Sequence, residues 1–268
     1  MSWHASLALD YRLEAGRSVA RHRHDGPLRI LQSLYPEGDG TCHNVLVHPP
    51  GGLVGGDTLD MRVTVGTGAH GLVTTPGATR FYRSEAGLAT QQVHARVDDG
   101  ARLEWLPLEA LAYSGCDALN LARFELAPSA ELMTWDITAL GLPHAQQPFE
   151  RGIFRQHLEI PDVWLERGTI AADDQRLMDS PLGLAGQRCM ATLVFAAGSA
   201  IAPERAEAAL EAARGLIEHS PLRTMAGATQ AHPQVIVLRV LAPVVEPAMQ
   251  LLRPVWACLL YTSDAADE

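Results

Sequence analysis

Apolar and polar side chains alternate along much of the chain, and the clearest example is the segment 58–65. Leu59, Met61, Val63 and Val65 fall on one side of an extended chain, and the polar residues between them fall on the other. This period of two residues predicts a β-strand with one buried face. Similar patterns predict strands at 5–12, 28–34, 42–47, 72–75, 93–97, 103–106, 124–126, 132–137, 156–160, 163–167, 190–196 and 235–241.

A weak internal repeat groups some of these strands. The strands that end near positions 65, 97 and 126 are each followed by a tight turn and another strand, and the pairs Gly68-Ala69, Gly100-Ala101 and Ser129-Ala130 mark the turns at intervals of about 30 residues. A unit of this size cannot bury its apolar face alone, so the copies are expected to stack. The repeat favours stacked β layers or a β-solenoid.

The period changes near the C-terminus, where two helices are predicted. The first covers 203–218, with Pro203 in its first turn and an apolar stripe that includes Leu210, Ala213 and Ile217. The second covers 247–260, and Pro254 is expected to kink or shorten it. No linker interrupts the pattern. It predicts one mainly β domain over 1–260 with a helical patch near its C-terminal end.

Two remaining segments are predicted to be irregular. The segment 21–27 is rich in charged and histidine side chains and is predicted to be a polar turn. If it were a strand, His22 and His24 would share a face and could hold a metal, but a solvated loop is the favoured interpretation. The last residues, 261–268, are expected to be a truncated or foreign tail.

Composition and motifs exclude several classes of function. The net charge is −10 and no basic stripe is present, which argues against a nucleic-acid partner. The chain shows no signal sequence and no apolar run of membrane-spanning length, so no membrane association is expected. The four cysteines form no CxxC pair, which indicates reduced thiols and a cytoplasmic protein. Signatures of nucleotide-binding loops, GxSxG hydrolases and zinc proteases are missing.

Candidate chemistry centres on a shaped loop and on acids in apolar surroundings. The loop 48–57 contains two prolines and four glycines and ends at Asp57, at the start of a predicted strand. Asp136 lies on the strand face opposite Met133, Trp135 and Ile137. Because a buried carboxylate is costly unless it is paired or binds a cation, both are candidate ligands. For Glu104, Glu109 and Glu166, local sequence favours a surface acid or a structural ion pair.

The chain resembles the UreD (UreH) family of urease accessory proteins over roughly residues 1–257. The segments that carry the resemblance are Gly26-Pro27-Leu28, Tyr35-Pro36-Glu37-Gly38, the loop His48-Pro49-Pro50-Gly51-Gly52-Leu53-Val54-Gly55-Gly56-Asp57, Thr75-Pro76-Gly77-Ala78-Thr79-Arg80-Phe81-Tyr82-Arg83-Ser84, Leu103-Glu104-Trp105-Leu106-Pro107, Trp135-Asp136, Leu140-Gly141-Leu142-Pro143 and Leu165-Glu166-Arg167. The C-terminal segment 258–268 does not resemble the ending of that family, whose members continue with a Pro-rich tail.

The resemblance implies a scaffold and metallochaperone rather than an enzyme. Similar proteins bind UreF, which recruits the GTPase UreG, and the assembly promotes Ni²⁺ delivery to apo-urease. The implied fold is a mainly β, two-layer helical β arrangement with two helices near the C-terminus. The implied route is an internal polar passage whose positions match Asp57, Asp136 and Glu166. These carboxylates would be weak, transient nickel ligands, with no permanently bound cofactor.

Two other functions remain open at this point. A β-solenoid hydrolase would use a carboxylate pair, which requires two acids roughly 5 to 10 Å apart in an open cleft. A binding scaffold without a metal route would use Asp57 only to accept hydrogen bonds from loop amides.

Overall fold

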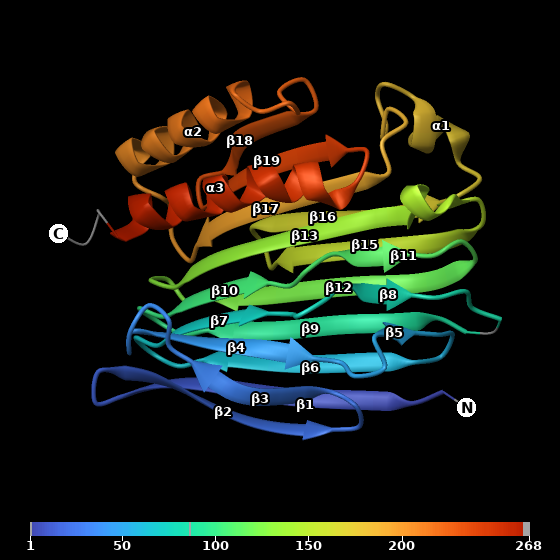
Figure 1. Ribbon diagram of the computed structural model, residues 1–268. Coiled ribbons are helices and arrows are strands. Elements are labelled where there is room, and N and C mark those ends of the chain that lie inside the picture. The colour runs from blue at the N-terminus through green and yellow to red at the C-terminus, as the bar shows by residue number, and fades with distance from the viewer. Residues whose placement is uncertain (1, 86, 265–268) are drawn as a thin grey trace.

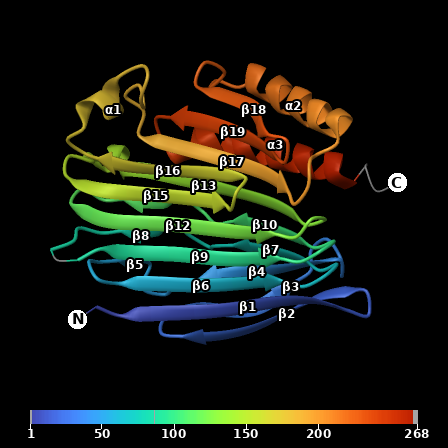
Figure 2. The same cartoon turned by 180° about the vertical axis from the view of Figure 1, so that it is seen from behind.

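The computed structural model describes residues 2–85 and 87–264, and in this part of the chain the strands form two sheets that face each other (Figures 1 and 2). The first sheet is seen from its outer side in Figure 2. Its strands, in spatial order, are β16 (Trp164–Ala171), β15 (Gly152–Ile160), β12 (Cys116–Leu126), β9 (Ala89–Val97), β6 (Thr58–Val65), β1 (His4–Glu14) and β2 (Arg17–Asp25).

The second sheet lies on the side that carries the long helices in Figure 1. Its main path is β18 (Ala226–His232), β19 (Val235–Ala242), β17 (Cys189–Ala197), β13 (Glu131–Leu142), β10 (Arg102–Leu106), β7 (His70–Thr74), β4 (Thr41–Val47) and β3 (Arg29–Leu34). Short strands extend it beside this path, namely β5 (Gly52–Leu53), β8 (Thr79–Phe81), β11 (Ala110–Ala112) and β14 (Gln147–Pro148).

The middle of the chain winds between the sheets as a solenoid. Each of the pairs β6–β7, β9–β10 and β12–β13 crosses from the first sheet to the second, and successive coils pair in parallel. The turns also stack, because the Gly68 amide donates to the Asp99 carbonyl at 3.2 Å and the Gly100 amide donates to the Ser129 hydroxyl at 2.9 Å. The β-solenoid-like arrangement predicted from the repeat is therefore confirmed.

The second sheet separates two apolar cores. The first core fills the space between the sheets and includes Leu9, Met61 and Phe154. The second core lies between the outer face of the second sheet and the helices α2 (Pro203–Glu218) and α3 (Val245–Asp264), and it includes Leu193 and Leu252. Side chains of β13 alternate between the two cores, so this strand is buried on both faces.

The observed helices agree in part with those predicted from the sequence. The structure places α2 at the predicted residues, whereas α3 begins earlier than predicted and continues to Asp264. Pro254 lies inside α3 and does not end it, because Leu251, Leu252 and Val255 hold the helix on the sheet. α3 thus enters the segment 261–268, to which the sequence assigned no structure, and residues 265–268 lie outside the described part of the chain. Two short elements, η1 (Pro143–Ala145) and α1 (Gln175–Asp179), were not predicted.

The prediction of a turn at 21–27 is wrong for its first part. Residues up to Asp25 belong to β2, which pairs with β1 at the edge of the first sheet. Charged side chains are typical of such edges because they discourage pairing with another chain. The rings of His22 and His24 stack with centroids 5.8 Å apart. Within the described residues they belong to no group of three or more potential metal ligands.

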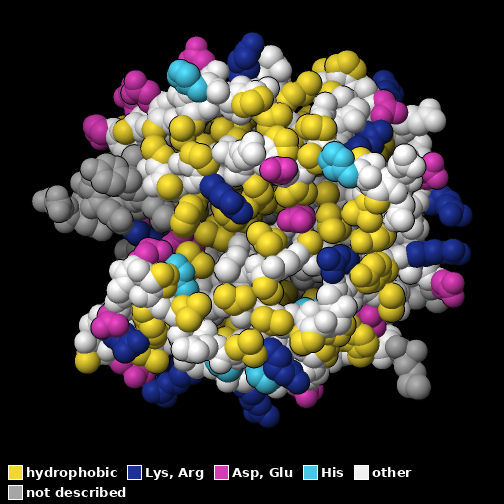
Figure 3. All heavy atoms as spheres, in the orientation of Figure 1, with side chains coloured by type: hydrophobic (Ala, Val, Ile, Leu, Met, Phe, Trp, Pro, Cys, Tyr) yellow, Lys and Arg dark blue, Asp and Glu magenta, His cyan; other side chains and the backbone are white. Residues whose placement is uncertain are grey.

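The surface differs in character between the rim and the centre of the helix-bearing face. Figure 3 shows hydrophobic side chains spread across the centre of this face, with charged side chains gathered mainly at its edges. Leu31 and Leu34 on β3 are 77% and 45% exposed. Among the described residues, no helix combines the length and the apolarity needed to span a membrane.

Candidate functional site

A row of amide side chains crosses the inner face of the first sheet. Gln91 on β9, Asn120 on β12 and Gln156 on β15 are direct neighbours in the strand register. They share the inward face of their strands with core residues such as Val93 and Phe154. The Gln91 amide donates to the Asn120 carbonyl oxygen at 3.1 Å. The row is therefore a polar line through an apolar core.

The second sheet presents a matching row. Asp136 on β13 is paired with Thr192 on β17, Thr192 with Arg239 on β19, and Arg239 with Gly227 on β18. The Asn120 amide donates across the gap between the sheets to the Asp136 carboxylate at 3.4 Å. We call the two facing rows, together with Glu166 on β16, the polar seam.

Asp136 is the most deeply placed acid of the seam and is 8% exposed. Burial, together with the negative charge of Glu166, raises the pKa of Asp136 to about 6, although hydrogen bonds with Gln156 and Thr138 oppose the shift. No cation pairs with Asp136 among the contacts of the described residues. The carboxylate is held by neutral groups alone, which leaves its charge uncompensated when it is ionised.

Glu166 closes the seam at the edge of the first sheet. Its Oε1 accepts a hydrogen bond from the Thr192 hydroxyl at 3.1 Å, and its Oε2 accepts one from the Arg239 guanidinium at 3.1 Å. The Glu166 side chain is 13% exposed, whereas the Arg239 side chain is 58% exposed. The ion pair favoured from the sequence is therefore present, but it lies at the mouth of the seam rather than on the open surface.

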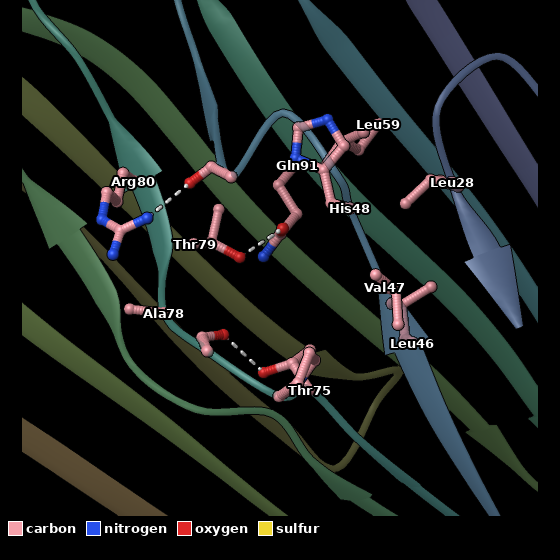
Figure 4. A pocket seen from close by; sticks show the side chains of 13 residues that line it. Leu28, Leu46, Val47, His48, Leu59, Thr75, Ala78, Thr79, Arg80 and Gln91 are labelled. Carbon is pink, nitrogen blue, oxygen red and sulfur yellow. Dashed lines mark hydrogen bonds between the residues drawn. The ribbon is translucent and has the colours of Figure 1, made fainter. Parts of the chain in front are cut away.

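Two cavities lie along the polar seam. A cavity of about 30 Å³ is lined by Gln91, Asn120 and Asp136, and it is large enough for a water molecule. A second cavity of about 120 Å³ also touches Gln91 and is bounded by His48 and Arg80 (Figure 4). In this cavity the Thr79 hydroxyl donates to the Gln91 carbonyl oxygen at 3.1 Å, as the dashed line in Figure 4 shows. Gln91 therefore joins the two hollows.

A wider groove opens at the other end of the seam. It measures about 540 Å³ and is lined by Glu166, Thr192, Arg239 and Gly227. It forms because β16 is the edge of the first sheet, while the second sheet continues to β19 and β18.

Asp57 lies at the exit of the proline-glycine loop and is 1% exposed. Its Oδ1 accepts the backbone N–H of Trp3 at 3.1 Å, and its Oδ2 accepts that of Val54 at 3.0 Å. Both oxygens thus hold loop and N-terminal backbone, which is the role that the scaffold interpretation gave to this residue. Burial lowers the pKa of the nearby His48, and the charge of Asp57 opposes that shift. The structure links Asp136 to Glu166 through Thr192, and it places Asp57 at the end of the loop whose His48 and Gly51 line the cavity of about 120 Å³.

The other acids singled out from the sequence lie on the opposite side of the second sheet. Glu104 is 1% exposed. Its oxygens contact His70 Nε2 at 2.8 Å and accept the Trp256 indole N–H at 2.6 Å. Glu104 therefore has a structural partner, as the sequence favoured, and the contact is an ion pair when His70 is protonated. Glu109 lines a separate open groove that also contains Arg188.

Sequence reasoning missed the neutral members of the seam. None of the four residues Gln91, Asn120, Gln156 and Thr192 was singled out from the sequence. A signal was present, because each occupies the inward parity of its strand, two residues from a buried apolar side chain. Polar residues at that parity require partners inside the core.

The fold and the seam together define a two-layer β-solenoid protein with a line of oxygen and amide groups through its core. A family model described as UreD urease accessory protein matches residues 4–266. Relatives described as "Urease accessory protein UreD" are 65% identical over 257 residues in Albidiferax ferrireducens and 66% identical over 256 residues in Paracidovorax citrulli, each alignment covering 96% of this chain and 93% of the relative. A relative of the same description in Methylibium petroleiphilum is 52% identical over 275 residues, with 95% and 93% coverage. The chain belongs to the UreD family of urease accessory proteins.

Proposed function

We propose that this accessory protein is a non-enzymatic scaffold that acts with UreF and UreG to deliver Ni²⁺ into apo-urease, and that the ion passes along the polar seam. The observation that supports this proposal is a polar line that runs by hydrogen bonds from Thr79 through Gln91 and Asn120 to Asp136, and then by strand register to Thr192, which donates to Glu166. A core that served only stability would gain nothing from an uncompensated carboxylate at Asp136.

The donor set of the seam suits an ion in transit. Asp136 and Glu166 offer carboxylate oxygens, and the amides and Thr192 offer neutral oxygens. Oxygen donors hold Ni²⁺ less firmly than imidazole or thiolate ligands do, so an ion can be exchanged from one group to the next. Because both oxygens of Asp57 accept backbone N–H groups, we assign Asp57 to shaping the loop 48–57 rather than to binding the ion.

The surface supports a role in an assembly. The exposed apolar side chains of β3 and the hydrophobic centre of the face in Figure 3 are typical of protein–protein contact surfaces. Accessory partners such as UreF would cover such surfaces in the complex.

The test is co-expression of the urease subunits, UreF and UreG with either the wild-type chain or Asp136→Asn. Asparagine keeps the size of the side chain and removes the negative charge. We expect the specific activity of urease and its nickel content to fall several-fold. The matched control is Asp117→Asn, because Asp117 lies on the outer side of the first sheet, where its side chain is 44% exposed and paired with Arg155. Full activation by a folded, complex-forming Asp136→Asn chain would overturn the route.

A further inference from the structure

Arg239 lies where the polar seam meets the wide groove. It stands on the inner face of β19, beyond the edge of the first sheet, and its guanidinium reaches back to Glu166 Oε2 at 3.1 Å. The guanidinium also lies 5.7 Å from the centre of the Trp164 ring, which shares the inward face of β16 with Glu166. The positively charged guanidinium of Arg239 therefore lies between the groove and the carboxylate and amide groups of the polar seam.

Both carboxylate oxygens of Glu166 accept a hydrogen bond. Thr192 donates to one carboxylate oxygen and Arg239 to the other. Thr192 is in turn the register neighbour of Asp136. Thr192 and Glu166 both line the groove, so a cation that moves between Asp136 and the groove passes beside Glu166, where it meets the guanidinium. Arginine stays protonated at all physiological pH values, so a change of pH does not remove this barrier.

The surroundings allow the guanidinium to move. The Arg239 side chain is 58% exposed, and an ion pair with so exposed a partner is held weakly. Its register neighbour on β18 is Gly227, and a Cβ at that position would meet no atom within 4 Å. The groove therefore has open space on the side away from Glu166.

We propose that Arg239 is a displaceable cation that closes the Glu166 end of the seam, and that a divalent cation occupies or passes Glu166 only after the guanidinium swings into the groove. This inference rests on the proposed function for its meaning in nickel delivery. The guanidinium takes the position of the ion at Glu166, so the seam is closed to cations at rest. Arg239 is thus a positioning and selectivity residue rather than a ligand.

The test measures Ni²⁺ binding to the chain purified in complex with its co-expressed accessory partners, using equilibrium dialysis with Ni²⁺ alone. We expect Arg239→Gln to tighten Ni²⁺ binding roughly two- to fivefold, the range set by the strength of an exposed ion pair. Arg239→Lys keeps a positive charge and should bind Ni²⁺ as the wild type does. The double variant Arg239→Gln with Glu166→Gln should lose the gain, because the effect acts through Glu166.

Arg123→Gln is the matched control, since Arg123 forms a 2.6 Å ion pair with Glu159 on the outer face of the first sheet. Its Ni²⁺ affinity should equal that of the wild type. Unchanged or weaker Ni²⁺ binding by a folded Arg239→Gln complex would overturn the proposal, as would a gain that persists in the double variant.

The two proposals fail separately. If Asp136→Asn lowers urease activation while Arg239→Gln leaves Ni²⁺ binding unchanged, the route stands and the barrier is wrong. If Arg239→Gln tightens Ni²⁺ binding through Glu166 while Asp136→Asn activates urease fully, the barrier stands and the route is wrong.

Discussion

The two faces of the second sheet hold buried carboxylates in opposite ways. On the helix-bearing face, Glu104 touches the His70 imidazole at 2.8 Å and the Trp256 indole N–H at 2.6 Å. On the inner face, the described residues that donate hydrogen bonds to Asp136 are neutral, and burial is the main cause that raises its pKa to about 6. The two acids lie on neighbouring strands, β10 and β13.

The difference shows what each carboxylate is for. Glu104 links α3 to the sheet through the oxygen that accepts the Trp256 N–H, and its other oxygen contacts His70 on the neighbouring strand β7. Removing such a group leaves buried partners without hydrogen bonds. Asp136 makes few contacts that hold elements together, and its negative charge destabilises the fold at neutral pH. A carboxylate kept in the core against that cost is available to a ligand.

The largest effect expected from this comparison is on Glu104. Glu104→Ala should lower the free energy of unfolding by about 3 kcal/mol, because the indole N–H and the imidazole lose their buried partner. Denaturant unfolding followed by tryptophan fluorescence measures the change. Glu125→Ala is the control, since Glu125 is 55% exposed in its pair with Arg123, and it should change stability by no more than about 0.5 kcal/mol. A loss below about 1 kcal/mol for Glu104→Ala would contradict the role of a structural fastener.

Asp136→Asn is expected to change stability with the opposite sign. The folded pKa of about 6 exceeds the ordinary value of 3.8, so the protonated form is favoured on folding. The wild type therefore has this contribution in full below about pH 4 and loses it as the pH rises through 6. Above that pH the variant should be more stable than the wild type by about 3 kcal/mol, because a pKa difference of one unit corresponds to about 1.4 kcal/mol. Unfolding curves at pH 5 and pH 8 test this: the advantage of the variant must grow between them, and a constant difference would refute it.

The architecture was accessible from sequence because it depends on local pattern. The strand–turn–strand units around Gly68 and Gly100 predicted the coils, and the stripe of α2 predicted that helix. Pro254 misled the prediction for α3, since packing on the second core outweighed the missing backbone hydrogen bond. Segment 21–25 misled it as well, because polar composition is typical of both turns and edge strands.

The site was less accessible because it depends on pairs far apart in the chain. The partner of Glu166 is Arg239, 73 positions away, and no local pattern joins them. The contact between Asp57 and Trp3 spans 54 positions. It gives Asp57, a candidate ligand from the sequence, the role of holding the loop and the N-terminal backbone. Asp136 was identifiable, since its strand placed it opposite Met133 and Trp135, but the amides that face it required the register of the other sheet.

The smallest expected change in stability is that of a substitution at Glu166. This substitution best distinguishes a carboxylate that stabilises the fold from one that binds the ion. Glutamine keeps an oxygen that accepts from Thr192 and loses the charge that attracts Arg239. Because that partner is 58% exposed, Glu166→Gln should alter the free energy of unfolding by about 0.5 kcal/mol or less. If Glu166 belongs to a route, urease activation in co-expressing cells should nevertheless fall several-fold. The opposite result would be a loss of stability near that of Glu104→Ala, with urease activation falling only in proportion to the amount of folded protein. Glu166 would then have a structural role like that of Glu104 and no role in the nickel route.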